Sequence, residues 1–296
     1  MKKLIVALVV IVAAVFWWQR TPLTDSNPYV FAVVDEEGKP TDMKYTVPDD
    51  KDILTQENSE QILYGKRLLN ETKRLLPDNV GAAMNCNSCH LFQGKLEYGD
   101  PYINTYNSFP QFNSRAERVV TIEERINGCF QRSMNGTPLP EQSDEMKAII
   151  AYYKWLAQDV PHGWQVVHQN TGPIDTSLQP NMDKGEEIYG AMCASCHGDN
   201  GEGMWDASGN IMFPPLWGDD SFNIGAGMAR LYKAAAFVKY NMPMGYTMNR
   251  PQGQGHVLTD QEAVDVSYYF TQKPRPDFPA KVYDWPSGKK PKDARY

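Results

Sequence analysis

Cysteine and histidine occur together twice in this sequence, in a pattern that can hold a cofactor. The pattern Cys-x-x-Cys-His runs from Cys86 to His90 and again from Cys193 to His197. Covalent attachment of a c-type haem requires two thiols, which bond the porphyrin vinyl groups, and an adjacent histidine, which binds the iron. A zinc site would need a second Cys or His pair nearby, and the other three histidines do not supply one. We therefore expect two haem c groups. The expected attachment residues are Cys86, Cys89, Cys193 and Cys196, and the expected iron ligands are His90 and His197.

The second axial ligand of each iron sets its redox chemistry. In the second half of the chain, Met242 follows His197 by 45 residues, in a Pro-containing segment between two expected helices. A thioether ligand raises the reduction potential and suits electron transfer. Met244 is the competing candidate two residues later. We expect Met242 to bind the second iron.

Two residues compete for the corresponding position in the first half. Met134 follows His90 by 44 residues and matches Met242 in spacing, which would give a second His/Met haem. Cys129 follows His90 by 39 residues and is the only cysteine outside the two motifs. An unpaired thiol in an exported protein indicates a reactive role. If the segment is helical, the apolar residues that share a face with Cys129 are Val119, Ile122 and Ile126.

Positive charge gathers around this cysteine. The 18 residues from Arg115 to Arg132 hold four arginines, although the whole chain has 29 Lys and Arg against 36 Asp and Glu. Arg125, Cys129 and Ser133 follow one another at intervals of four and so share a helix face. Guanidinium groups bind oxyanions, and nearby positive charge favours thiolate over thiol. The cluster predicts an anion site at a reactive cysteine, unless the arginines pair with haem propionates or nearby glutamates.

The elements that must position these residues form a tandem duplication. Cys193 follows Cys86 by 107 residues, a helical pattern precedes each motif, and an apolar helix closes each half. The expected helices are 59–76 and 143–156 in the first half, and 182–192, 231–240 and 259–270 in the second. Asn181 is an expected N-cap, and Thr259 and Glu262 form an expected capping box. No alternating strand pattern is evident, so we expect an all-α fold.

The length of 296 residues fits two domains. We expect class I-like cytochrome c domains at 58–158 and 181–272, joined by a polar linker at 159–180. Residues 21–57 form an N-terminal extension. Residues 273–296 contain five prolines, which predicts an extended C-terminal tail over a domain surface.

Residues 1–20 carry the features of an export signal or a membrane anchor. Lys2 and Lys3 precede an apolar run over 4–18. We expect an uncleaved anchor, with the rest of the chain in the periplasm. The formal charge of −7 argues against nucleic acid as a partner.

The segment Arg125-Ile-Asn-Gly-Cys129-Phe-Gln-Arg-Ser133-Met-Asn-Gly-Thr-Pro resembles the signature of the diheme thiosulfate dehydrogenases, also called tetrathionate reductases. The haem motifs, the loop at 241–243 and the closing segment 293–296 are similar too, so the resemblance covers most of the chain from about residue 58. It implies that Cys129 is the distal ligand of the active-site haem. It also implies that Arg115, Arg125 and Ser133 line the substrate pocket. Some members bind the second iron through a lysine just before the methionine, but this chain has Asn241 there, which favours His/Met ligation.

The resemblance implies that the protein joins two thiosulfates into tetrathionate with release of two electrons, or catalyses the reverse. Thiolate ligation would hold the first haem at low potential and Met242 would hold the second at high potential, so that electrons pass to an external carrier such as a cytochrome. Two other functions stay open from the residues alone. One is a non-enzymatic diheme electron carrier that uses Met134 and Met242. The other is a cysteine-ligated sulfur-oxidation cytochrome that needs a partner subunit.

Overall fold

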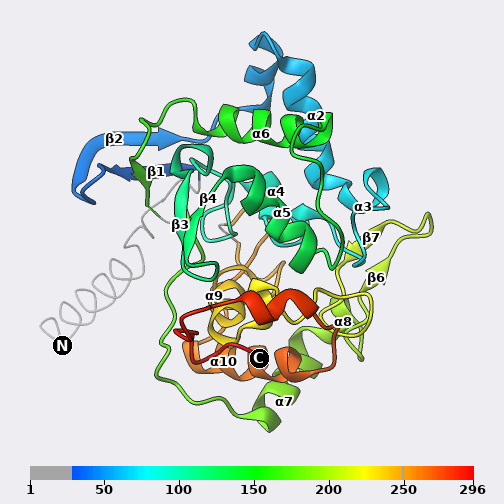
Figure 1. Ribbon diagram of the computed structural model, residues 1–296. Helices are drawn as coiled ribbons and strands as arrows, with labels where there is room; N and C mark the ends of the chain where they lie inside the picture. Colours follow the sequence, from blue (N-terminus) through cyan, green and yellow to red (C-terminus); the bar gives the residue numbers. More distant parts are fainter. Residues whose placement is uncertain (1–28, 168, 249) are drawn as a thin grey trace, which may run out of the picture.

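The computed structural model describes residues 29–167, 169–248 and 250–296 as two helical units, one above the other (Figure 1). The helices of the first unit are α2 (Ser59–Asn70), α3 (Thr72–Leu75), α4 (Leu91–Gly94), α5 (Ile122–Arg132) and α6 (Asp144–Ala157). Those of the second are α7 (Met182–Met192), α8 (Ala194–His197), α9 (Leu231–Asn241) and α10 (Asp260–Gln272).

The expected signal or anchor at 1–20 lies outside the described residues. Within the described ranges, none of the helices has the length and apolar character needed to cross a membrane.

The same helix crossing occurs in both units, as a duplication requires. In the first unit, a Cβ atom on Gly65 of α2 would lie 2.0 Å from the carbonyl oxygen of Ala148 in α6. In the second, a Cβ atom on Gly185 of α7 would lie 2.2 Å from the carbonyl oxygen of Asp265 in α10. In each unit, the glycine therefore lets the first and last helices meet backbone to backbone.

The expected helices are present, with the expected caps. The Asn181 side chain accepts from the Lys184 N–H at 3.1 Å, and Thr259 and Glu262 form a capping box at the start of α10. The helix expected at 59–76 is broken at residue 71 into α2 and α3. The buried Thr72 hydroxyl donates to the Leu68 carbonyl at 2.8 Å and accepts from the Cys86 N–H at 2.9 Å. A threonine that bonds back along a helix bends it, and this one ties the bend to the first haem motif.

The all-α expectation is wrong in one respect, because the described residues also form three small antiparallel sheets. The strands are β1 (Val30–Val34), β2 (Pro40–Thr46), β3 (Gln111–Asn113), β4 (Arg118–Val120), β5 (Gln165–Val166), β6 (Met204–Trp205) and β7 (Ile211–Phe213). They pair in the orders β2-β1-β5, β3-β4 and β6-β7. Val119 lies on β4 and is exposed, so it does not share a helix face with Cys129. Short strands with few buried residues carry little alternating pattern; on β2 only Tyr45 is buried.

The N-terminal extension and the linker pack together against the first unit. Val33 of β1 pairs with Val166 of β5, and both lie in a small apolar cluster with Phe31 and Tyr45. The Tyr45 hydroxyl donates to the carbonyl oxygen of Leu156 in α6 at 2.6 Å. Figure 1 shows the β1–β2 hairpin beside α6. These segments therefore belong to the body of the first unit.

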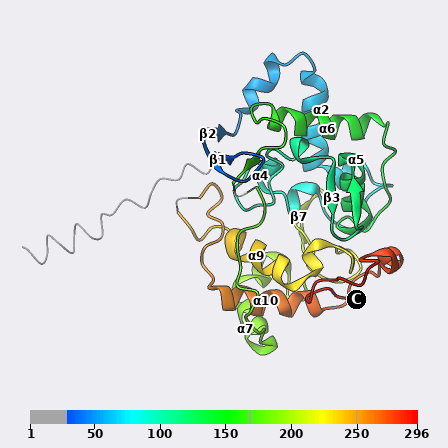
Figure 2. The same cartoon turned by 60° about the vertical axis from the view of Figure 1, so that its left-hand side comes forward.

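Residues 273–296 contact both units. They include a 3-10 helix, Pro279–Tyr283, so the segment is not extended throughout. The Trp285 N–H donates to the carbonyl oxygen of Arg115 in the first unit at 2.8 Å, and Asp293 pairs with Arg230 of the second at 2.7 Å. Figure 2 shows this red segment beside the lower unit and below β3. The C-terminal segment thus links the two units.

Candidate haem sites and active site

Both motif histidines are oriented by a backbone carbonyl group. The His197 Nδ1 lies 2.9 Å from the carbonyl oxygen of Pro214, and the His90 Nδ1 faces the carbonyl oxygen of Asp100. A histidine that donates from Nδ1 keeps the Nε2 lone pair free for a metal. The His90 ring also stacks on Tyr102 at 4.2 Å between centroids. Two histidines held in the same way, each next to two free thiols, fit c-type haem ligation.

A cavity of about 440 Å³ lies in the second unit and borders both motifs. Cys193, Cys196 and His197 line it together with Met242 and Met244. The first unit contributes Cys89, Leu91 and Phe92 to the same wall. An apolar cavity with two thiols, an oriented imidazole and thioethers suits a porphyrin. Both methionines reach the cavity, so the geometry does not separate Met242 from Met244.

Cys129 lies in an environment that favours a thiolate. Arg125 Nη1 donates to the Cys129 sulfur at 2.7 Å, one turn earlier on α5. Removal from solvent raises the pKa of Cys129, but the charge of Arg125 and the hydrogen bond with the neighbouring His90 outweigh it and lower the pKa to about 6. Burial instead raises the pKa of both Cys86 and Cys89 to about 12. The fifth cysteine is therefore electrostatically distinct from the motif thiols beside it.

Met134 has different surroundings from Cys129. Its side chain is 4% exposed and belongs to the main hydrophobic core. Its N–H donates to the Cys129 carbonyl at 2.9 Å, in the turn that ends α5. Cys129 is therefore the one of the two candidates that contacts both Arg125 and His90.

The four arginines of this stretch differ in their partners, and two of them share Asp284. Arg118 pairs with Glu124 at 2.6 Å on the surface, as the glutamate alternative expected. Arg132 pairs with Asp284, and Arg115 donates to the carbonyl oxygen of Gly225 and lies 3.8 Å from Asp284. Arg125 is thus the one that contacts the thiol. Ser133 is half-buried and follows α5 as its C-cap.

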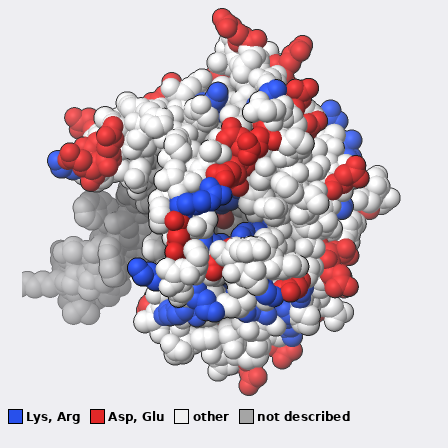
Figure 3. Space-filling model, viewed as in Figure 1, with Lys and Arg blue, Asp and Glu red and all other residues white. Residues whose placement is uncertain are grey.

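Positive charge extends from this stretch across the junction of the units. On the face shown in Figure 3, Lys and Arg side chains gather in the hollow between the units and over the lower unit. Burial lowers the pKa of Arg115, and the charges of Arg132 from the first unit and Arg230 from the second lie close enough to lower it further. Their carboxylate partners, Asp284 and Asp293, both belong to the C-terminal segment. The sequence reasoning missed Asp284, since no local motif marks it.

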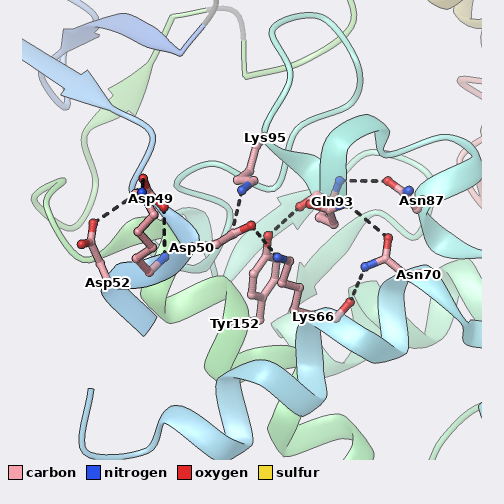
Figure 4. A network of polar contacts seen from close by, with 10 residues as sticks. Asp49, Asp50, Asp52, Lys66, Asn70, Asn87, Gln93, Lys95 and Tyr152 are labelled. Atoms are coloured by element: carbon pink, nitrogen blue, oxygen red, sulfur yellow. Dashed lines mark hydrogen bonds and ion pairs between the residues drawn. The ribbon is translucent and has the colours of Figure 1, made fainter. Parts of the chain in front are cut away.

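A polar network fixes the loop that follows His90 (Figure 4). The Gln93 N–H donates to the Asn87 side chain at 2.9 Å, and the Tyr152 hydroxyl of α6 donates to the Gln93 carbonyl at 3.0 Å. Lys95, which is buried, pairs with Asp50 of the N-terminal extension at 2.8 Å. Burial raises the pKa of Asp50, but its two lysine partners outweigh this and lower it overall. The extension therefore helps to hold the first haem motif in place.

Comparison with known proteins assigns the family. Residues 78–161 match the model of the SoxA/TsdA cytochrome c domain, and residues 182–272 match that of cytochrome c. A thiosulfate dehydrogenase from Psychrobacter arcticus is 44% identical over 258 residues, which cover 87% of this chain and 76% of that protein. The chain belongs to the thiosulfate dehydrogenase family. A second relative of that name, from Allochromatium vinosum, is 39% identical over 223 residues, covering 74% of this chain and 80% of the relative.

A solved structure of the same family has a similar fold. Thiosulfate dehydrogenase TsdBA from Marichromatium purpuratum, in its as-isolated form, matches with a TM-score of 0.70 and 32% identity. The match covers 79% of this chain and 50% of that one, so this chain spans about half of the longer protein. The two domain matches and the relatives together show that the protein consists of two tandem cytochrome c domains. It carries two covalently bound haem c groups.

Proposed function

We propose that this protein interconverts thiosulfate and tetrathionate and exchanges electrons with an external carrier. Two thiosulfate dianions join through one new sulfur–sulfur bond to give one tetrathionate dianion and two electrons, or the reverse occurs. The observation that carries the proposal is the Arg125–Cys129 contact beside His90. A simple electron carrier has no need of a thiolate held next to a proximal histidine. The names of the relatives support the same reaction.

The residues proposed to hold the haems follow from the two motifs. For the first haem they are Cys86 and Cys89 as thioether links, with His90 and Cys129 as iron ligands. For the second they are Cys193 and Cys196 as thioether links, with His197 and Met242 as iron ligands. Haem iron supplies one-electron redox chemistry, so two haems match the two electrons of the reaction.

The substrate is proposed to bind beside Cys129. Two dianions that must react repel each other, so their approach requires fixed positive charge. Arg125 supplies charge at the sulfur itself. Arg115, whose guanidinium is held by the C-terminal segment, is proposed to bind a sulfonate group, and Ser133 to donate a hydrogen bond. Cys129, once released from the iron, is proposed to form a sulfur–sulfur bond with the outer sulfur of the first thiosulfate, and the two electrons released in this step are those that the two haems would accept. The second thiosulfate then attacks that outer sulfur, which gives tetrathionate and frees the Cys129 thiolate.

The diheme carrier would use Met134 in place of Cys129. The contacts of Cys129 with Arg125 and His90 support Cys129 instead. We also propose domain limits of 58–158 and 181–272. The lysines and apolar run at the N-terminus support export to the periplasm and attachment to the inner membrane through residues 1–20.

Steady-state rates of the purified, haem-loaded protein in both directions test the function. Thiosulfate with ferricyanide as acceptor must yield tetrathionate, and tetrathionate with a reduced viologen must yield thiosulfate. Arg125→Lys should lower kcat/KM by about 10²-fold, because the shorter, more strongly hydrated ammonium group does not reproduce the guanidinium contact with the Cys129 sulfur. Arg118→Lys is the matched control, because Arg118 belongs to a surface ion pair on the same stretch. This variant should keep kcat/KM within about twofold of wild type. Absence of turnover in both directions would refute the proposal.

A further inference from the structure

One segment of the second unit is rich in acidic residues, and basic side chains of the C-terminal segment contact it, Lys273 over Trp217 and Arg275 at the Phe222 carbonyl. Residues 193–229 contain five Asp and Glu and no Lys or Arg. All five side chains are exposed: Asp199, Glu202, Asp206, Asp219 and Asp220. Figure 3 shows the white tip of the β6–β7 hairpin at the right-hand edge, with both red and blue side chains beside it.

Exposed apolar side chains of the same segment, together with Tyr246, lie at the haem cavity. Met212 of β7 is 55% exposed and Tyr246 is 60% exposed, and both also line the cavity. Trp205 and Met204 on the paired strand β6 are exposed as well, at 40% and 37%. Exposed apolar side chains that gather beside a cofactor cavity indicate a contact surface rather than chance exposure.

The first unit adds no free positive charge at this opening. Its contribution to the cavity lining includes three uncharged amides, Asn70, Asn85 and Asn87. The two basic residues of the adjacent α3 have partners of their own. Arg74 pairs with Glu71, and the Lys73 ammonium donates to the carbonyl oxygen of Val80 at 2.5 Å. The opening is therefore lined by apolar and uncharged side chains, and the exposed carboxylates belong to the segment that carries β6 and β7.

We propose that this surface, formed by β6, β7, the flanking acidic residues and Tyr246, docks a small electron-carrier protein with a basic contact face. Opposite charges steer two proteins together and set their orientation, while a small apolar centre allows close approach and rapid release. The complementary partner presents lysines around its own redox centre. The inference rests on the proposed function, in which electrons reach the external carrier from the second unit.

Bimolecular electron transfer tests the docking surface without thiosulfate. The protein is reduced with dithionite, freed of excess reductant and mixed by stopped flow with a strongly basic mitochondrial cytochrome c or with an acidic cytochrome c. We expect the basic acceptor to react at least about tenfold faster at low salt, and its rate to fall about tenfold as ionic strength rises to about 0.2 M. Equal rates with the two acceptors, or a rate independent of salt, would overturn the proposal.

Matched variants locate the surface. Asp199→Asn with Asp219→Asn should lower the low-salt rate by at least about threefold, because two charges near the contact are lost. Glu36→Gln with Asp42→Asn removes the same charge from the β1–β2 hairpin and should change the rate little. Met212→Ser should lower the rate at high salt as well, since it removes apolar contact.

Binding gives a second readout that involves no electron transfer. Titration of the oxidised protein into labelled basic cytochrome c should shift that protein's lysine-face NMR signals. The shifts should be smaller with the Asp199→Asn, Asp219→Asn double variant and should persist with the Glu36→Gln, Asp42→Asn control. Equal effects of the two pairs would place the contact elsewhere. Failure of thiosulfate turnover together with a preserved acidic-surface effect would refute the proposed reaction and leave the docking surface standing.

Discussion

Replacing Asp284 by asparagine is expected to destabilise the junction between the two units. The Asp284 side chain is 5% exposed and accepts from two guanidinium nitrogens of Arg132, at 2.8 and 2.9 Å. Arg115 lies 3.8 Å away, and the Tyr296 hydroxyl donates to the same carboxylate. Asparagine keeps the shape but removes the charge, so both arginines lose their ionic partner.

The magnitude follows from the burial of the pair. Breaking a buried ion pair from one side costs about 3–5 kcal/mol. The Arg132 side chain is 21% exposed, so water can solvate part of the charge that loses its partner. We therefore expect the free energy of unfolding to fall by about 3 kcal/mol. At roughly 2–4 °C per kcal/mol, the thermal midpoint should fall by about 6–12 °C.

Thermal unfolding of the haem-loaded protein, followed by far-ultraviolet circular dichroism, measures this change. Asp277→Asn is the matched control, because Asp277 pairs with Lys281 on an exposed turn of the same segment. Its midpoint should stay within about 2 °C of wild type. An Asp284→Asn midpoint equally close to wild type would show that the C-terminal carboxylate does not hold the two units together.

Three further predictions test the fold and the sites. Gly65→Ala and Gly185→Ala should each lower the free energy of unfolding by about 1–3 kcal/mol in guanidinium, because the new Cβ meets a backbone carbonyl oxygen. Gly190→Ala, on the same α7 but with nothing within 4 Å, should not destabilise. The lowered pKa of Asp50 means that its ion pairs stabilise the protein above about pH 4 and that this contribution is lost as pH falls through the folded pKa. The stability difference between wild type and Asp50→Asn should therefore shrink in acid unfolding series below that pH, and a constant difference would contradict the assignment. Met242→Gly should remove the near-infrared band of a methionine-ligated haem, whereas Met244→Gly should retain it; the opposite pattern would exchange the two assignments.

Features that depend on local sequence were predictable. The capping box at Thr259 and the N-cap at Asn181 act over three residues, so their helices begin where expected. The Arg125–Cys129 contact follows from an interval of four on one helix. Each haem motif is a run of consecutive residues and can be found in the sequence directly. The repetition of the motif predicts two units in tandem.

Features that depend on distant partners were not predictable from the sequence. Asp284 meets Arg132 across 152 residues, and nothing near either residue marks the pair. β5 is two residues long and pairs with β1 because apolar side chains of the extension and the linker cover the same end of the first unit. Arg115 was grouped with Arg125 from its position in the sequence, yet its contacts lie with Gly225, Asp284 and Trp285. Tertiary packing decides these contacts, and a single sequence does not encode them in any local pattern.

The chemistry proposed at Cys129 is tested most directly by tetrathionate formation in a Cys129→Gly variant. The variant is purified with its haem content measured, and thiosulfate oxidation is followed beside wild type. The account predicts that both haems stay attached, that the thiolate signature in electron paramagnetic resonance disappears, and that turnover falls by at least about 10³-fold. A variant that keeps both haems and oxidises thiosulfate at the wild-type rate would contradict it.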